Sequence, residues 1–186
     1  MLIDVGNGIA GGSPSNPVKI GEYHYPIGAT HSAFPFHSVT AGGRFYVFAG
    51  DEQFPYGLNP DNAAQAEAGG YVHVVDFTDL KNPVEVARYQ VPEAGPHNFW
   101  VENDTLYVAY YNAGLRVVDV SGELMGNLYD QGREIARFKA YDPQGKVPNT
   151  PMAWGPQPHR GHIFFSDFNS GLWAVQLPQP RRPAVP

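Results

Sequence analysis

The sequence has 186 residues, the length of one domain or a small pair, with 21 Gly, 18 Pro and only 16% charged residues. Glycine and proline at this frequency favour turns and interrupt long helices, so we expect a mostly β chain. The formal net charge of −6 argues against nucleic acid and anionic membrane surfaces as partners. No apolar run could span a membrane. The absence of cysteine excludes disulfides and thiolate ligands and leaves the redox compartment open.

The chain opens with LIDV at 2–5, a shortened copy of a strand that returns at 70–77, 114–121 and 171–178. These first residues lack the basic end and apolar stretch of a signal peptide. Next comes NPVKIGEY at 16–23, which aligns without a gap on NPVEVARY at 82–89; REIARF at 133–138 is a third copy. Alternating side chains in all three copies predict half-exposed strands.

Two further strands precede each later copy of these two. The second strand of the unit in chain order is predicted at RFYVFAGD (44–51), TLYVAYYN (105–112) and HIFFSDFN (162–169). The strand before it is predicted at HSVTAGG (37–43), HNFWVEND (97–104) and the irregular MAWGPQPHRG (152–161). The repeat is therefore four strands, named A (inner), B, C and D (outer) in chain order.

Four antiparallel strands in roughly 45 to 65 residues are typical of a β-propeller blade. We predict an all-β chain whose residues 1–186 form one partial β-propeller. Strands C and D of a preceding blade lie at 1–30, complete blades at 31–91 and 92–143, and a last blade without its outer strand at 144–186. Closed propellers need at least about four blades. The chain is thus expected to be the C-terminal part of a longer propeller, because Met1 falls inside a repeat, or else half of a ring closed by two copies.

VVDFTDLKNPVEVARY at 74–89 and LRVVDVS at 115–121 resemble the LVIVD-repeat family of bacterial propellers. The resemblance implies a periplasmic, extracellular or cell-surface location and specifies the fold more than any chemistry. Asp4, Asp76 and Asp119 recur at the end of strand C, whereas Gln176 replaces the aspartate in the last repeat. Because every blade needs the following turn, we predict that these aspartates accept hydrogen bonds from turn amides.

Histidines recur in the predicted D-to-A connections, at 24–37, 91–98 and 148–162. The candidate metal ligands are His31, His37, His97, His159 and His162. If these imidazoles meet near the channel mouth, they could bind zinc, copper or iron. This placement is distantly similar to the propellers of the selenium-binding protein and methanethiol oxidase group, which hold a metal on inner-strand histidines. The alternative is that each histidine tethers its own connection by a hydrogen bond.

The B-to-C connection at 51–70 is unusually long and is expected on the same face as the histidines. The predicted binding face consists of Asp51, Glu52, Phe54, Tyr56, Trp100 and Trp154. The same loop could equally be a solvated excursion with one helical turn capped by Asp61. The tryptophans are otherwise expected to pack between blades, and His73 to be a packed or edge histidine.

The function predicted from the sequence is a non-catalytic scaffold that binds a protein partner through this face. The partner could be the missing blades, a membrane-associated complex or a second copy of the chain. The alternative is a metal-dependent enzyme, such as an oxidoreductase, with Asp51 or Glu52 as an acid/base group. No nucleophile motif or phosphate-binding loop is present, so no catalytic residue is assigned.

Overall fold

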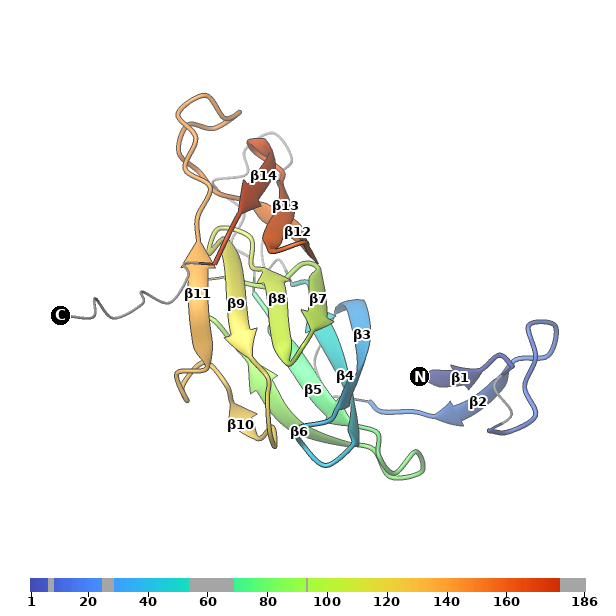
Figure 1. The fold of residues 1–186 in the computed structure, drawn as a ribbon. Coiled ribbons are helices and arrows are strands. Elements are labelled where there is room, and N and C mark those ends of the chain that lie inside the picture. The colour runs from blue at the N-terminus through green and yellow to red at the C-terminus, as the bar shows by residue number, and fades with distance from the viewer. Residues whose placement is uncertain (7–8, 25–28, 54–68, 93, 178–186) are drawn as a thin grey trace.

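The computed structural model describes residues 1–6, 9–24, 29–53, 69–92 and 94–177. Every regular element in these ranges is a β-strand, which confirms the all-β prediction (Figure 1). With no helix among the described residues, there is also none that could cross a membrane. The strands are β1 (Leu2–Asp4), β2 (Val18–Gly21), β3 (Thr30–Ser38), β4 (Arg44–Asp51), β5 (Val72–Asp76), β6 (Val84–Tyr89), β7 (Phe99–Glu102), β8 (Thr105–Ala109), β9 (Leu115–Asp119), β10 (Gly126–Asn127), β11 (Glu134–Phe138), β12 (Ala153–His159), β13 (His162–Asp167) and β14 (Gly171–Val175).

The strands form four sheets that follow one another along the chain. Their strand orders are β1-β2, β10-β6-β5-β4-β3, β11-β9-β8-β7 and β12-β13-β14. Apart from β10, which pairs in parallel with β6, all neighbours are antiparallel and consecutive within the sheet. The second and third sheets each contain the predicted A-B-C-D meander, and the fourth contains A, B and C.

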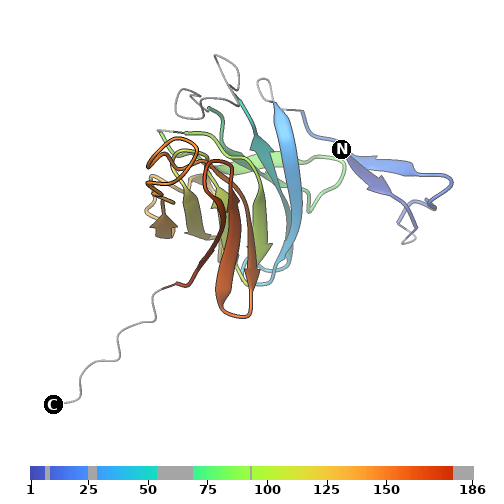
Figure 2. The same ribbon diagram turned by 90° about the horizontal axis from the view of Figure 1, so that it is seen from above.

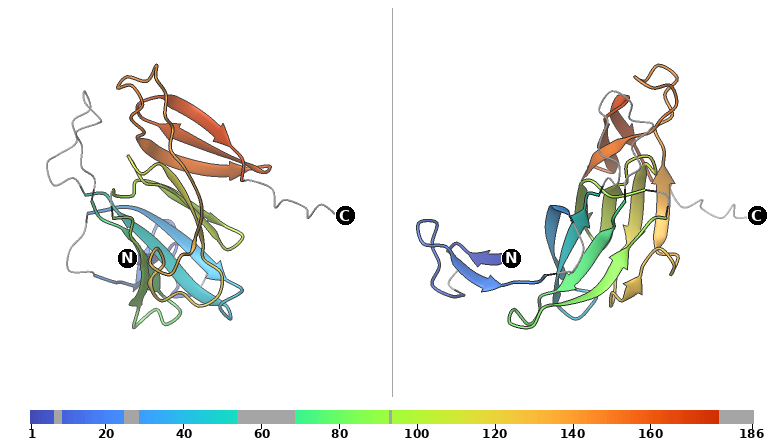
Figure 3. Two further views of the ribbon diagram at one scale, coloured as in Figure 1. Left: turned by 90° about the vertical axis from the view of Figure 1, so that its left-hand side faces the viewer. Right: turned by 180° about the vertical axis from the view of Figure 1, so that it is seen from behind.

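The last three sheets stand side by side with their faces packed together, whereas β1 and β2 project away from them (Figures 2 and 3). The inner strands touch in sequence, since β3 contacts β7 and β7 contacts β12. One apolar cluster around Phe48, Val74 and Leu106 fills the space between the second and third sheets. Another, around Leu115, Ile163 and Phe165, lies between the third and fourth. The sheets are thus joined by burial of the faces that they share.

The C and D strands pair with the same irregularity in each of the first three sheets. The register skips one residue of strand D, which is Ile20 in β2, Val86 in β6 and Ile135 in β11. A β-bulge of this kind increases the local twist of the strand pair. The sequence repeat is therefore also a repeat of local geometry.

A hydrogen-bonded chain crosses the boundary between successive sheets. Tyr89 at the end of β6 donates its hydroxyl to Glu134 on β11 at 2.6 Å, and Glu134 accepts from Arg116 Nη1 on β9 at 2.9 Å. Arg116 is fully buried, so this carboxylate compensates a charge that water cannot reach. Burial is the largest cause that raises the pKa of Tyr89, and the contact with Glu134 raises it further. The hydroxyl therefore stays protonated and acts as a donor.

The preceding boundary carries the same chain of groups. Tyr23, at the position of Tyr89, donates to Glu85 at 3.4 Å, and Glu85 contacts Nδ1 of the buried His73 at 2.9 Å. We call this arrangement the hydroxyl–carboxylate–base chain. At the next boundary, Phe138 replaces the tyrosine and Trp173 replaces the buried base, with their rings 5.6 Å apart. The third boundary is therefore apolar where the first two are charged.

The recurring aspartates cap the turns after strand C, as predicted. Backbone amides of Gly6, Thr78 and Ser121 donate to Asp4, Asp76 and Asp119 respectively, at 2.8–2.9 Å. Burial alone would raise the pKa of Asp119, but the hydrogen bonds from Ser121 outweigh it and hold that pKa below its usual value. These aspartates are structural.

The inner strand of the second sheet begins earlier than predicted. Strand β3 starts at Thr30 instead of residue 37, whereas β12 (Ala153–His159) lies within the segment 152–161 predicted for it. Both strands contain proline, which normally interrupts a sheet. Each is an edge strand, with a hydrogen-bonded neighbour on one side only among the described strands. Pro35 and Pro156 lack an N–H group, and this costs no ladder hydrogen bond if that backbone position faces the unpaired side.

The hydroxyl–carboxylate–base chain predicts a large stability loss when its carboxylate is removed. Glu134→Ala leaves the buried Arg116 without this partner, and we expect the free energy of unfolding to fall by about 3 kcal/mol. Glu123→Ala, at an exposed carboxylate 3.3 Å from Arg44, is the matched control and should have no measurable effect. Urea denaturation of both variants checks this, and equal losses would contradict the role of the chain.

Candidate functional site

Three successive sheets place side chains at the same point, where strand A begins and strand B ends. His31 and Trp154 occupy one-residue bulges in the A–B pairing, opposite the last residues of β4 and β13. His97 holds the equivalent position before β7, where its amide donates to the carbonyl of Ala109 at 2.8 Å. The residues that follow the B strands at this level are Glu52, Tyr111 and Phe168. The six side chains form one cluster.

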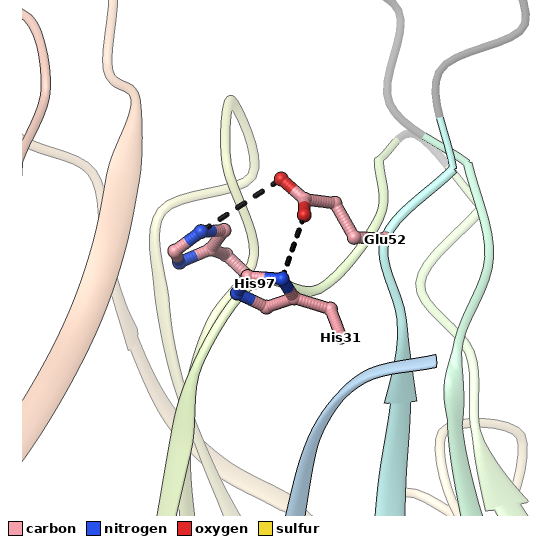
Figure 4. Close-up of side chains that lie close together, drawn as sticks. All are labelled: His31, Glu52 and His97. Carbon is pink, nitrogen blue, oxygen red and sulfur yellow. Dashed lines mark ion pairs between the residues drawn. The ribbon is translucent and has the colours of Figure 1, made fainter. Parts of the chain in front are cut away.

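Two histidines and one carboxylate lie at the polar end of this cluster (Figure 4). His31 Nδ1 is 2.9 Å from Glu52 Oε2, and His97 Nε2 is 3.7 Å from Glu52 Oε1. The two imidazole rings lie 4.3 Å apart, centre to centre. Glu52 is held in place through its backbone, because its amide donates to the carbonyl of Ala29 at 3.0 Å.

The hydrogen bond at the other side of its ring fixes the tautomer of His97. Nδ1 lies 2.6 Å from the carbonyl oxygen of Trp154, which can only accept, so Nδ1 carries the proton. Burial lowers the pKa of His97, more than the nearby carbonyl and Glu52 raise it, and favours the neutral ring. The lone pair on Nε2 therefore points toward Glu52 with no proton of its own.

Tyr111 closes the cluster from the third sheet. Its hydroxyl donates to Glu52 Oε1, and its ring meets His97 edge to face with centres 5.4 Å apart. Burial is the largest cause that raises the pKa of this hydroxyl, and the hydrogen bond to Glu52 raises it further. Tyr111 therefore keeps its proton and remains a donor. Its backbone is left-handed, with φ of 40°, an unfavourable conformation for a bulky residue that is most often found at functional sites.

The fourth sheet contributes an apolar wall to the same cluster. The Trp154 ring packs edge to face on His97 with centres 4.9 Å apart, and against Phe168 at 4.7 Å. These aromatic rings exclude water from one side of His97 and strengthen the electrostatic interactions there. The side chains of the cluster are thus ionisable on the second sheet and apolar on the fourth, with His97 and Tyr111 of the third sheet between them.

The polar end has the composition of a metal site. One nitrogen from each of His31 and His97 and one oxygen of Glu52 lie within 4.8 Å of one another. Tetrahedral zinc bonds of about 2.0–2.1 Å would place ligand atoms roughly 3.4 Å apart, so the most distant pair must approach by at most about 1.4 Å. The carboxylate of Glu52 beside the two imidazoles favours a cation between them.

The other predicted metal ligands are not in this cluster. His37 lies at the far end of β3, where it stacks on Phe45 with ring centres 4.5 Å apart. His159 and His162 face each other across the hairpin of β12 and β13, beside a surface pocket that also includes Glu102 and Arg160. The prediction that all five histidines meet fails because His37 and His159 lie at the opposite ends of the long strands β3 and β12, and His162 begins β13 opposite His159.

Asp51 is buried beneath the cluster instead of being presented on a binding face. It is 1% exposed, and its Oδ2 lies 2.9 Å from Nε2 of His73. Nδ1 of the same ring contacts Glu85, so His73 connects two carboxylates across three strands. Asp51 and His73 therefore form a structural pair.

The remaining predicted face residues are scattered. Phe54 and Tyr56, with most of the 51–70 connection and its helical turn, lie outside the described residues. Trp100 is partly exposed and packs on Phe34 between the second and third sheets, with ring centres 5.2 Å apart. Tyr111 and Phe168 were missed, although the ungapped alignment of TLYVAYYN on HIFFSDFN places them at the same position.

Comparison with known proteins adds no assignment to this geometry. The chain matches no protein-family model, and a search of curated proteins gives no match. The resemblance to LVIVD repeats therefore remains a prediction made from the sequence motifs.

A structural role of Asp51 predicts a loss of stability when it is replaced. Asp51→Ala removes one carboxylate from the fully buried His73, and we expect the free energy of unfolding to fall by about 3 kcal/mol. Glu102→Ala, at an exposed carboxylate, serves as the control. Chemical denaturation of both variants gives the comparison, and an Asp51→Ala protein as stable as the control would mean that the pair contributes little.

Proposed function

We propose that the chain forms consecutive blades of an LVIVD-type β-propeller and that it binds a divalent transition metal at His31, Glu52 and His97. The radial arrangement is supported by the repeated bulge, by the repeated hydroxyl–carboxylate–base chain and by the contacts between inner strands. A repeated unit with the same contact to each neighbour produces a constant rotation from sheet to sheet. The family resemblance supports an exported location for such an array.

The observation that supports metal binding is the unprotonated Nε2 of His97 facing a carboxylate oxygen 3.7 Å away. Two lone-pair atoms that face each other without a proton between them repel each other, and a cation near both would remove this repulsion. The second histidine, His31, is placed to complete the set.

Two histidines and one carboxylate are the ligands of many catalytic zinc sites and of non-haem iron oxygenases. Both kinds of site leave coordination positions open for water or substrate. Here, Tyr111 would orient Glu52 as a hydrogen-bond donor beside the metal. The site thus favours the metal-dependent alternative over a scaffold without a metal, while binding of a partner protein remains a second function, favoured by the exposed side chain of Leu172 on the last sheet.

Metal binding at this cluster predicts that each ligand variant loses affinity. Calorimetric titration of the metal-free protein with Zn²⁺ or Co²⁺ should give one site per chain, and His97→Ala, His31→Ala and Glu52→Gln should each weaken it by about 100-fold or more. Tyr111→Phe should weaken binding by only about 10-fold, because it removes an orienting hydrogen bond and no ligand.

The matched controls are His37→Ala and His159→Ala, which remove histidines at the opposite ends of the strands. Both should bind metal like the unmodified protein. The proposal is wrong if no stoichiometric binding occurs, or if the control variants lose as much affinity as the ligand variants.

A further inference from the structure

A groove lies between the first and second sheets, beside the outer strand β6. It has a volume of about 470 Å³, within the range of small-molecule sites, and its lining includes Tyr23, Tyr71, Glu85, Val86 and Arg88. Tyr23 follows β2 of the first sheet, whereas the other four residues lie on or directly before strands of the second sheet. The groove thus combines two charged side chains with two aromatic ones.

The β-bulge in β6 places the two opposite charges on the same wall of this groove. Glu85 and Arg88 are three residues apart, and in a regular strand such side chains point to opposite faces. The bulge at Val86 changes the register, and the partners of the two residues on β5 are Val75 and His73 respectively. Because these partners are only two residues apart, they share one face of the sheet, and Glu85 and Arg88 share it with them.

Both charged groups are held in place by their neighbours. The side chain of Glu85 is 22% exposed, and its carboxylate contacts the buried His73 at 2.9 Å and accepts from Tyr23 at 3.4 Å. The guanidinium carbon of Arg88 lies over the Tyr71 ring, 5.6 Å from its centre. The face of an aromatic ring attracts such a cation. The groove therefore presents one carboxylate and one guanidinium at defined places.

Tyr71 distinguishes this boundary from the next one. It directly precedes β5, whereas the residue directly before β9 is Gly114. Gly114 has a φ of 80°, and a Cβ at this position would clash with the carbonyl oxygen of Phe138. Arg137, the counterpart of Arg88 on β11, therefore cannot rest on a side chain from this position. The seat for the guanidinium belongs to the second sheet.

The charges of the groove are complementary to a ligand that carries both signs. Among the described residues, Arg88 has no carboxylate within ion-pair distance, although Glu85 lies on the same face. A ligand with only a negative charge would be attracted by Arg88 and repelled by Glu85, and a ligand with only a positive charge would meet the reverse. A zwitterion satisfies both groups, and the two tyrosine rings and Val86 can contact its apolar part.

We propose that this groove binds a free amino acid with a hydrophobic side chain, its carboxylate on Arg88 and its ammonium on Glu85. A guanidinium can bind a carboxylate through two parallel N–H donors. Glu85 can accept from the ammonium because its contacts with His73 and Tyr23 use one oxygen each, and every carboxylate oxygen has two lone pairs. The site is separate from the proposed metal ligands and does not depend on them.

Three probes with the same aromatic group separate the two charges. L-Phenylalanine carries both charges, L-phenylalanine amide carries only the ammonium, and N-acetyl-L-phenylalanine carries only the carboxylate. Calorimetric titration of each probe into the full chain should show L-phenylalanine binding at least about tenfold more tightly than either derivative, because each derivative loses one charge-assisted contact.

Variants of the protein locate the binding. Arg88→Met removes the guanidinium and should make L-phenylalanine bind as weakly as its amide. Arg137→Met, at the exposed counterpart on β11, is the matched control and should bind L-phenylalanine like the unmodified protein. His97→Ala should also bind it normally, which distinguishes the groove from chelation of a metal ion by the amino acid. The comparison of the three probes uses the unmodified protein and does not depend on the folding of any variant.

Each remaining outcome counts against the proposal. If no probe binds, the groove is not an amino-acid site. If the amide binds as tightly as L-phenylalanine, the groove takes cations alone, and if the N-acetyl derivative does, it takes anions alone. An equal loss of affinity in Arg88→Met and Arg137→Met would place the ligand elsewhere. A loss in His97→Ala would assign the binding to the metal cluster, so failure of this proposal and failure of the metal site have different readouts.

Discussion

At the first two boundaries, the position of one sheet on the next depends on a tyrosine hydroxyl that reaches the carboxylate of its neighbour. Apolar faces pack with little regard to direction, and sliding one over another costs little as long as the area stays buried. His73 and Arg116 change this situation because both are fully buried and both need a carboxylate at a fixed place. Tyr23 and Tyr89 tie those carboxylates to the preceding sheet. At these two boundaries, the angle between the sheets is therefore set by polar contacts inside an apolar interface.

Much of the fold was readable from the sequence because its signals are local. Alternating side chains, glycine at the tight connections and a threefold repeat of the same strand gave the sheets and their order. The early start of β3 was not readable, since proline excludes a central strand but is tolerated at an edge, and edges depend on the tertiary structure. Strand β10 has only two residues and no pattern to detect.

The candidate site could be predicted only in part for a related reason. His31, His97 and Glu52 were identified as residues of the right type near strand ends, but which histidines meet depends on strand lengths. Tyr111 was missed because its role depends on a left-handed backbone that turns the ring toward His97. Asp51, next to Glu52 in the sequence, faces His73 instead. Adjacent residues at a strand end point in opposite directions, and only the structure reveals which one enters the cluster.

The short strand β10 has a consequence for how this chain could be divided. It comes from the segment between β9 and β11, yet it pairs with β6 of the sheet before, where Leu128 donates its amide to the carbonyl of Arg88. A fragment of residues 31–91 alone would lose this pairing with β10 and would expose the outer backbone of β6. The sequence repeat and the smallest piece able to fold independently therefore have different boundaries, and a transplanted repeat would need the first half of its successor.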